Sequence, residues 1–388
     1  MPHEQRQNFG AAKWPLRLSG RPGRPAAGRG APGGLRGSSV VIVLGVETSC
    51  DETSVAVLDG DGRVLSNVIA SQMQAHAAYG GVVPEIAARA HLENLPSVFE
   101  EALATAGVAL SDVDLIAATA GPGLIGALLV GLSGARALAF ARGLPLVPVN
   151  HLEGHLFSAY LRAGREPALA MEFPFHGLVV SGGHAELVRV EEKRIAPLAR
   201  TRDDAPGEAF DKVARRAGLP YPGGPVVDRI AARGDGSRFA LPVGRAGDGS
   251  EDFSFSGVKS AMLRQFEKRG LDGSPLAAEN LTQELADLFA SFQRAIVTAL
   301  LQRVETVHRR EGMRSLALSG GVAANSELRA TLSRWGRDNG VAVLLPEKSL
   351  TTDNAAMIAW AGLLRFRQEG APDPDTVAAR SRWPLGTA

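Results

Sequence analysis

Apolar runs separated by short polar turns form the clearest pattern in the chain, and this pattern occurs twice. The first copy predicts a strand from Val40, a polar turn at 49–53, a returning strand over 54–58, a hairpin turn at 59–62 and a third strand over 64–69. The second copy predicts a strand over 175–180, a polar turn at 181–184 and a returning strand over 185–190. Antiparallel strands are therefore expected to open each half of the protein.

Segments with helical periodicity follow each copy, most clearly over 87–106 and 279–309. A chain of 388 residues is long enough for two cores. We predict an α/β protein with an N-terminal lobe of residues 40–150 plus 352–388 and a C-terminal lobe of residues 151–351. The two polar turns would face each other across a cleft, where their backbone N–H groups and hydroxyls can hold phosphates.

A third element strengthens the prediction of a phosphate-binding cleft. The apolar run 315–319 is followed by Gly320 and Gly321, and a helix is expected from about Ser326. Glycines allow a ribose or an adenine ring to approach the backbone, and a helix N-terminus favours negative charge. This order of strand, glycines and helix predicts a nucleoside-binding surface.

The motif His151-Leu-Glu-Gly-His155 is the strongest sign of metal chemistry. Two histidines four positions apart lie on one face of a helix, so both imidazoles can reach one zinc or ferrous ion. In zinc peptidases the glutamate directly follows the first histidine, whereas Glu153 is two positions from each one and would face away. From these residues alone, two histidines without a metal remain an alternative to the metal site.

Composition narrows the class of protein. The longest apolar runs, such as Leu124 to Leu132, are far shorter than a membrane helix needs, so no membrane span is predicted. The single cysteine, Cys50, cannot form an intramolecular disulfide, which favours a reducing compartment and a cytoplasmic location. Neither observation identifies a substrate.

Charge is distributed unevenly along the chain. Residues 1–39 contain seven basic residues and one acidic residue, a net +6, so the remaining chain carries −5 of the overall +1. Binding of a nucleic acid would therefore need a local basic patch or a partner protein. The Gly-, Pro- and Arg-rich residues 1–39 are predicted to be disordered, with a targeting segment or a start codon assigned too early as alternatives.

Nine short motifs lie in order along the chain. They are VETSCDET at 46–53, YGGVVPE at 79–85, TAGPGL at 119–124, HLEGH at 151–155, VSGGH at 180–184, GEAFDK at 207–212, YPGGP at 221–225, DFSFSGVK at 252–259 and TDN at 352–354. From about residue 41 to Pro384, the chain resembles the tRNA threonylcarbamoyladenosine transferases, the TsaD family, in their bacterial form.

The resemblance implies a fold and a reaction. The fold would be the actin-like, sugar-kinase-like ATPase (ASKHA, ribonuclease H-like) fold, with two lobes and a duplicated mixed sheet. The reaction would transfer the threonylcarbamoyl group from threonylcarbamoyl-AMP to N6 of the adenosine 3′-adjacent to the anticodon, in tRNAs that read ANN codons, with release of AMP. The implied partners are tRNA, the inactive paralogue TsaB and the P-loop ATPase TsaE.

The resemblance also implies roles for individual residues. Asp353 would join His151 and His155 as the third ligand of one divalent metal ion, Fe²⁺ or alternatively Zn²⁺. Asp51 and Glu52 would face the cleft, and one of them could accept the proton from N6. The implied substrate-binding residues are Val179, Val180, Ser181, Gly182, Gly183, Asp211, Gly224, Asp228 and Asn325.

Two other functions compete with this hypothesis. An ATP-dependent small-molecule kinase of the same fold would also need two phosphate turns and a nucleoside-binding surface, but it would have no use for the paired histidines. A metallopeptidase would use the histidines, but the position of Glu153 argues against it.

Overall fold

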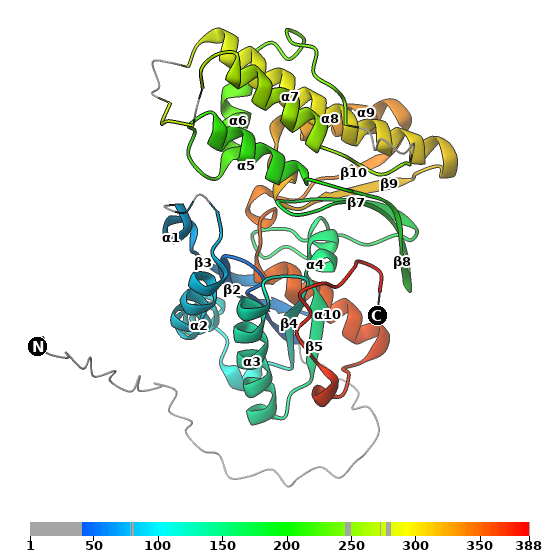
Figure 1. The fold of residues 1–388 in the computed structure, drawn as a ribbon. Helices are drawn as coiled ribbons and strands as arrows, with labels where there is room; N and C mark the ends of the chain where they lie inside the picture. Colours follow the sequence, from blue (N-terminus) through cyan, green and yellow to red (C-terminus); the bar gives the residue numbers. More distant parts are fainter. Residues whose placement is uncertain are drawn as a thin grey trace, which may run out of the picture. The chain divides into compact units, whose positions relative to one another are not determined.

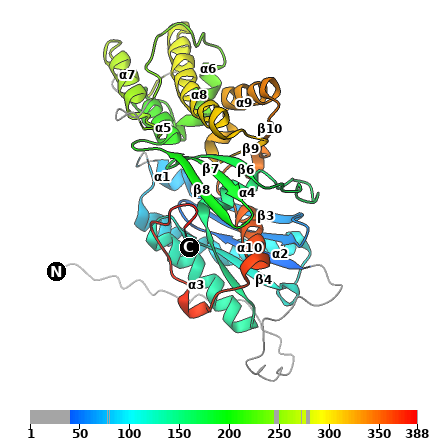
Figure 2. The same ribbon diagram turned by 90° about the vertical axis from the view of Figure 1, so that its right-hand side faces the viewer.

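The computed structural model describes residues 41–77, 79, 81–244, 250–271, 273–276 and 281–387. The predicted disordered segment 1–39 lies outside these residues. The chain divides into two units, Met1–Gly37 and Ser38–Ala388, and all the described residues belong to the second. Its ribbon is drawn from two sides in Figures 1 and 2.

Two five-stranded mixed sheets share one topology within this unit. The first sheet has the order β3-β2-β1-β4-β5, and the second has the equivalent order β8-β7-β6-β9-β10. In each sheet three antiparallel strands come first in the chain, and two later strands then add parallel to the first of them. The predicted duplication of a mixed sheet is therefore confirmed.

The predicted strands lie close to their expected positions, whereas β4, β5, β8 and β10 were not predicted. The first sheet contains β1 (Ile42–Glu47), β2 (Glu52–Asp59), β3 (Val64–Ser71), β4 (Leu115–Gly121) and β5 (Leu146–Asn150). The second contains β6 (Phe175–Val180), β7 (Ala185–Glu191), β8 (Arg194–Arg200), β9 (Ser315–Ser319) and β10 (Ala342–Leu344).

Helices cover both sheets and lie between them. The helices around the first sheet are α1 (Met73–Ala77), α2 (Pro84–Ala106), α3 (Ile125–Arg142) and α10 (Ala355–Glu369). The helices packed on the second sheet are α5 (Pro206–Arg216), α6 (Gly223–Ala231), α7 (Ser256–Glu267), α8 (Gln283–Glu311) and α9 (Ser326–Asn339). The short α4 (His151–Ser158) links the two groups, and short 3-10 turns occur at Leu110–Asp112, Gly321–Ala324, Lys348–Leu350 and Pro374–Thr376.

Alternation along the buried strands sorts side chains onto the two faces of the first sheet. Val43 and Leu115 pack with α10 on one face, whereas Leu44 and Ile116 pack with α2 and α3 on the other. Gly45 lets α10 approach closely, because a Cβ at this position would lie 2.3 Å from the carbonyl oxygen of Ala355. The start of α10, and Asp353 just before it, is thereby held close to β1.

Helix α4 lies where the two halves meet. Its apolar residues Leu152 and Leu156 pack with Phe175 and Val179 on the face of the second sheet opposite α8. Its other side contacts α10. The predicted lobe boundaries after residues 150 and 351 stay a prediction, since α4 and α10 contact each other across them.

Among the described residues, α3 is the one helix that is long and apolar enough to span a membrane by length and composition. Only 33% of its residues are buried, and its inner face packs against β4 and α2. Residues such as Leu128, Leu132 and Ala135 form that inner face. One face of α3 thus packs on the first sheet and α2, and the rest of the helix is half-buried or exposed.

Candidate functional site

The helix with the paired histidines starts directly at the end of β5. Asn150 caps it, because its Oδ1 accepts a hydrogen bond of 2.9 Å from the backbone N–H of Leu152. The Asn150 side chain also donates to the carbonyl oxygen of Trp383, 3.0 Å away. The C-terminal segment therefore helps to fix where α4 begins.

Gly154 brings α4 against α10. A Cβ at this position would lie 2.7 Å from the Cδ1 atom of Ile358, so a larger residue would force the Ile358 side chain to move. Because Asp353 immediately precedes α10, this close crossing places its carboxylate beside both histidines. The glycine of the HLEGH motif thus has a packing function.

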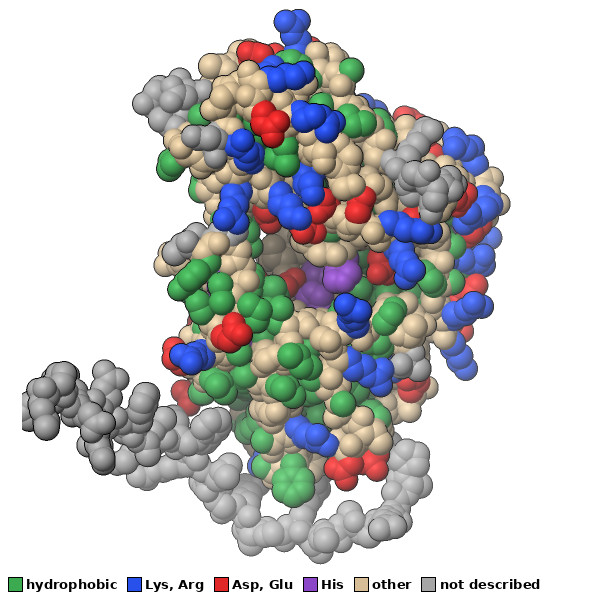
Figure 3. Space-filling view, in the orientation of Figure 1, with side chains coloured by type: hydrophobic (Ala, Val, Ile, Leu, Met, Phe, Trp, Pro, Cys, Tyr) green, Lys and Arg blue, Asp and Glu red, His purple; other side chains and the backbone are tan. Residues whose placement is uncertain are grey.

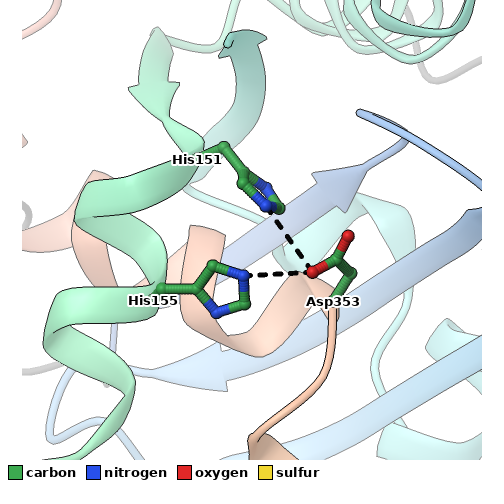
Figure 4. A group of neighbouring side chains, drawn as sticks. All are labelled: His151, His155 and Asp353. Carbon is green, nitrogen blue, oxygen red and sulfur yellow. Dashed lines mark hydrogen bonds and ion pairs between the residues drawn. The ribbon is translucent and has the colours of Figure 1, made fainter. Parts of the chain in front are cut away.

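The structure brings His151, His155 and Asp353 together (Figure 4). The Nε2 atom of His155 lies 3.0 Å from Asp353 Oδ1, and the Nε2 atom of His151 lies 3.5 Å from the same oxygen. One ligand atom from each residue can be chosen so that all lie within 4.8 Å of one another. An ion about 2.0–2.2 Å from each donor would need small movements of these side chains toward it, and two imidazoles with one carboxylate suit a divalent metal with open positions.

Electrostatics in the metal-free site favour a cation. Burial alone would raise the pKa of Asp353, but the imidazoles of His151 and His155 hold it below its ordinary value. Burial would lower the pKa of His151, but the carboxylates of Asp353 and Glu47 raise it to about 9. The proton on His151 therefore lies between two ionised carboxylates, at a position where another cation could take its place.

Glu47 is a functional residue that the sequence analysis missed. Its side chain is fully buried, and its Oε2 atom lies 3.0 Å from His151 Nδ1. It also accepts hydrogen bonds of 2.5 Å from the Ser49 N–H and from the Thr119 hydroxyl. When Nδ1–H of His151 donates to Glu47, its Nε2 lone pair is left for a metal, which is the usual arrangement around ligating histidines. A carboxylate at the end of the apolar run 42–47, within the VETSCDET motif, was the available signal.

Asp51 and Glu52 lie in the loop between β1 and β2 and at the start of β2. Asp51 is buried, and Glu52 is partly exposed. Burial, together with the neighbouring carboxylates of Asp353 and Asp51, raises the pKa of Glu52 to about 9. Glu52 is therefore protonated at neutral pH in the metal-free protein. Histidine and acidic side chains line a hollow between the two halves in Figure 3.

The predicted phosphate turn follows β6. Val179 and Val180 are fully buried in the strand, so only their backbone could contact a ligand. Gly182 and Gly183 are exposed, and a Cβ at either would meet open space. Burial, followed by His151 and His155, lowers the pKa of His184 to about 4, which places this neutral ring near the metal ligands.

Helix α5 closes one side of this turn. The backbone N–H groups of Gly207 and Glu208 donate to the carbonyl oxygens of Ser181 and Gly182, at 3.2 and 3.1 Å. These first-turn N–H groups of α5 therefore hold the turn in shape. The exposed side of Gly182 and Gly183 remains accessible to a ligand.

The remaining predicted residues form two further groups. Asp211 accepts a hydrogen bond of 2.7 Å from the Gly223 N–H at the start of α6, next to Gly224, where a Cβ would meet open space. Asn325 donates to Asp228 Oδ1 over 3.1 Å and caps α9 through Leu328 N–H.

Asp228 already accepts hydrogen bonds from Ser326 as well as from Asn325. A cavity of about 510 Å³ between α6, α8 and α9 is lined in part by Ser326 and by Gln293, another partner of Asn325.

Most of the chain matches one known protein family. Residues 63–360 match the model of the TsaD family, described as tRNA N6-adenosine threonylcarbamoyltransferase. The chain belongs to the TsaD family. A relative of that name from Rhizobium leguminosarum bv. trifolii is 50% identical over 358 residues, which cover 88% of this chain and 94% of the relative. A relative from Geobacter metallireducens is 48% identical over 348 residues, or 89% of this chain and 98% of the relative.

The resemblance inferred from the nine motifs is thereby confirmed. The protein is a transferase that acts in tRNA modification, as its TsaD relatives are named. Family membership and the His151, His155 and Asp353 group together indicate a divalent metal. The kinase and peptidase hypotheses gain no support, and the charged neighbours of Glu153 are Arg365 and Glu369 on α10, away from the metal ligands.

Solved structures support the predicted fold. HypF from T. kodakarensis matches with a TM-score of 0.56 and 16% identity, over 85% of this chain and 48% of that chain. Full-length HypF in its phosphate- and nucleotide-bound form matches with a TM-score of 0.53 and 13% identity, over 86% and 56% of the two chains. With the duplicated sheet topology, this confirms the actin-like, sugar-kinase-like fold.

Proposed function

We propose that this TsaD protein transfers the threonylcarbamoyl group from threonylcarbamoyl-AMP to N6 of the adenosine 3′-adjacent to the anticodon, in tRNAs that read ANN codons. The observation that carries the proposal is the meeting of His151, His155 and Asp353 in a chain whose TsaD relatives bear the name of this activity. In the transfer, N6 attacks the carbamoyl carbon, the bond from that carbon to the AMP phosphate oxygen breaks, and AMP leaves.

The metal ion of this proposal is Fe²⁺, with Zn²⁺ as the second candidate, because two imidazoles and a carboxylate suit both. When bound, the ion would supply a Lewis acid for the carbamoyl carbonyl group. Glu47 would keep His151 in the tautomer whose Nε2 faces Asp353. The neutral ring of His184 would lie beside the substrate without adding charge.

The other residues would position the two substrates and move one proton. Backbone groups of Val179 to Gly183 would hold the phosphate and acyl group, while Gly224, Asp211, Asp228 and Asn325 would surround the nucleoside. Either Asp51 or Glu52, which lie together beside the cleft, would accept the proton that N6 loses. Holding the N6 amine against the carbamoyl carbonyl supplies much of the rate acceleration, because two bound reactants no longer have to meet by diffusion.

Partners and location complete the proposal. Residues 40–388 carry a net negative charge, which repels tRNA phosphates. A tRNA site shared with a partner protein therefore fits the charge better than a site on this protein alone. We propose that TsaB and TsaE are the partners, that the protein acts in the cytoplasm without a membrane, and that the lobes divide as 40–150 plus 352–388 and 151–351.

Incubation with unmodified tRNA, threonine, bicarbonate, ATP, the adenylate-forming enzyme and both partner proteins tests the function. The proposal expects threonylcarbamoyladenosine in the nucleosides of digested tRNA, detected by mass spectrometry. A tRNA transcript with guanosine at the target position is the matched control and should gain no modified nucleoside. Unmodified adenosine in every complete reaction would contradict the proposal.

Removing residues 1–39 is expected to leave transfer unchanged. The motifs of the family begin at residue 46, and the basic, Gly- and Pro-rich segment contributes none of the site residues. The full chain and the chain starting at Val40 should give the same initial rate and the same thermal midpoint. A loss of transfer in the shorter chain would show that the segment takes part in binding tRNA.

A further inference from the structure

A buried chain of polar side chains ends at the loop that contains Asp51. The Nε2–H group of His91, on α2, donates to the carbonyl oxygen of Cys50 over 3.0 Å, since that oxygen can only accept. His91 Nδ1 must then be the acceptor in this neutral ring. It lies 2.8 Å from the Thr53 hydroxyl and 3.2 Å from Gln72 Nε2, which both donate to it.

The chain continues through two more side chains. Gln72 Nε2 also donates to the carbonyl oxygen of Ala87 over 3.4 Å, which fixes the orientation of its amide. Gln72 Oε1 therefore accepts from the Nε2–H group of His76, at 3.3 Å. His76 Nδ1 accepts from the backbone N–H of Val83, also at 3.3 Å. One donor of each side chain from His76 through Gln72 to His91 thus points toward the Cys50 carbonyl.

These three side chains are buried, so each of their polar atoms needs a hydrogen-bond partner inside the protein. His76 and His91 are fully buried, and Gln72 is 4% exposed. A buried polar network is stable only when each member is satisfied, and here every side-chain nitrogen and oxygen of the three residues has a partner. Burial also holds the pKa of His91 below its ordinary value, so this ring is neutral at neutral pH.

The loop that receives these bonds contains Asp51 and leads directly into Glu52 at the start of β2. The backbone N–H of Gln72 donates to the carbonyl oxygen of Asp51 over 2.9 Å, and His91 binds the residue before it. In both views α1 and the start of α2 lie at the end of the first half that faces the second (Figures 1 and 2). The series of hydrogen bonds thus runs from Val83, in the YGGVVPE motif at 79–85, to the Cys50 carbonyl in the loop beside the cleft.

We propose that His91, Gln72 and His76 are positioning residues that hold the 50–53 loop, with Asp51 and Glu52, in the conformation used for transfer. Within the described part of the chain, none of the three forms a hydrogen bond with the metal ligands or the phosphate turn. The effect on turnover rests on the proposed function, whereas the effect on the loop does not. The two parts can therefore fail separately.

The histidine tautomers give a test without any substitution. In ¹⁵N-histidine NMR spectra, His91 and His76 are expected to have their proton on Nε2, with Nδ1 as acceptor. His91 is assigned by the signal that disappears in His91→Gln. A proton on Nδ1 of His91 would overturn the proposed direction of the chain.

Substitution of His91 tests the positioning itself. His91→Leu removes the bond to Cys50, so amide hydrogen exchange over 48–53 should accelerate and kcat should fall about 10- to 100-fold, as expected when reacting groups are misplaced. The KM for threonylcarbamoyl-AMP and the metal affinity should not change. His91→Gln keeps an N–H donor close to the Cys50 carbonyl and should restore most of kcat. His308→Leu, at the end of α8, is the control and should leave exchange over 48–53 unchanged.

Gln72→Met covers the case in which His91→Leu does not fold. It removes the donor to His91 Nδ1 but keeps the shape of the side chain, and it should change exchange and kcat in the same directions by smaller factors. Wild-type exchange over 48–53 together with wild-type kcat, in a folded His91 or Gln72 variant, would overturn the proposal. The wild type could fail to transfer the group while the variants still show faster exchange over 48–53. That result would support the role of these residues in holding the loop and would reject only the proposed function.

Discussion

Replacing His151 and His155 together by alanine is expected to abolish metal binding and to lower transfer by at least about 10³-fold, since Lewis-acid assistance is worth several kcal/mol. The substitution removes both nitrogen donors and leaves Asp353 as a single carboxylate, which holds an ion weakly. The fold should persist because the contacts that place α4, the Asn150 cap and the Gly154 crossing, involve neither side chain.

Three measurements separate these expectations. Metal content per chain is measured after reconstitution with Fe²⁺ or Zn²⁺, circular dichroism reports the fold, and the tRNA assay reports transfer. The matched control is His308→Ala, a histidine on α8 far along the chain from the metal ligands, which should retain the metal. A folded double variant that still binds one ion per chain would show that the metal is held elsewhere.

Replacing Glu47 by glutamine is expected to weaken metal binding by about 10- to 100-fold, the usual cost of losing a partner that orients a ligating histidine. Glutamine keeps the size of the side chain but loses the negative charge that faces His151 Nδ1 at 3.0 Å. His151 then has less reason to keep its proton on Nδ1, and its Nε2 is a poorer donor to the ion. Glu47→Leu should have a larger effect because the Ser49 N–H and the Thr119 hydroxyl also lose their acceptor.

Metal affinity is measured by competition with a chelator of known affinity. Glu153→Gln is the control, since Glu153 lies on the same helix but has its charged neighbours on α10. Its affinity should equal that of the wild type. If the metal affinity and kcat of Glu47→Gln equal those of the wild type, Glu47 has only a packing role at the end of β1.

Local patterns predicted much of the fold. The hairpins of both sheets follow from alternation and turn residues, and the glycines before Ser326 mark the start of α9. Helix α2 begins at Pro84 rather than at Ala87, because proline is well suited to the first turn, where no N–H bond is lost. Helix α8 begins at Gln283, where the Thr282 side chain accepts from Leu285 N–H.

The site depends on contacts between distant segments, and these are hard to predict from one sequence. His155 and Asp353 are 198 positions apart, and their meeting depends on the crossing of α4 and α10 at Gly154. Only the family resemblance pointed to Asp353. No local pattern connects Glu47 or His91 with its partner, because His151 and Cys50 are 104 and 41 positions away from them.

Transfer measured against metal occupancy is the most direct test of this account. The wild-type protein is stripped of metal and then loaded in steps below one equivalent, and each sample is assayed for threonylcarbamoyladenosine in a single turnover on unmodified tRNA. We expect the stripped protein to be folded and inactive. The yield of threonylcarbamoyladenosine should then rise in proportion to the bound ion until one ion is present per chain. Full transfer by stripped protein, with Asp353 and both histidines intact, would contradict it.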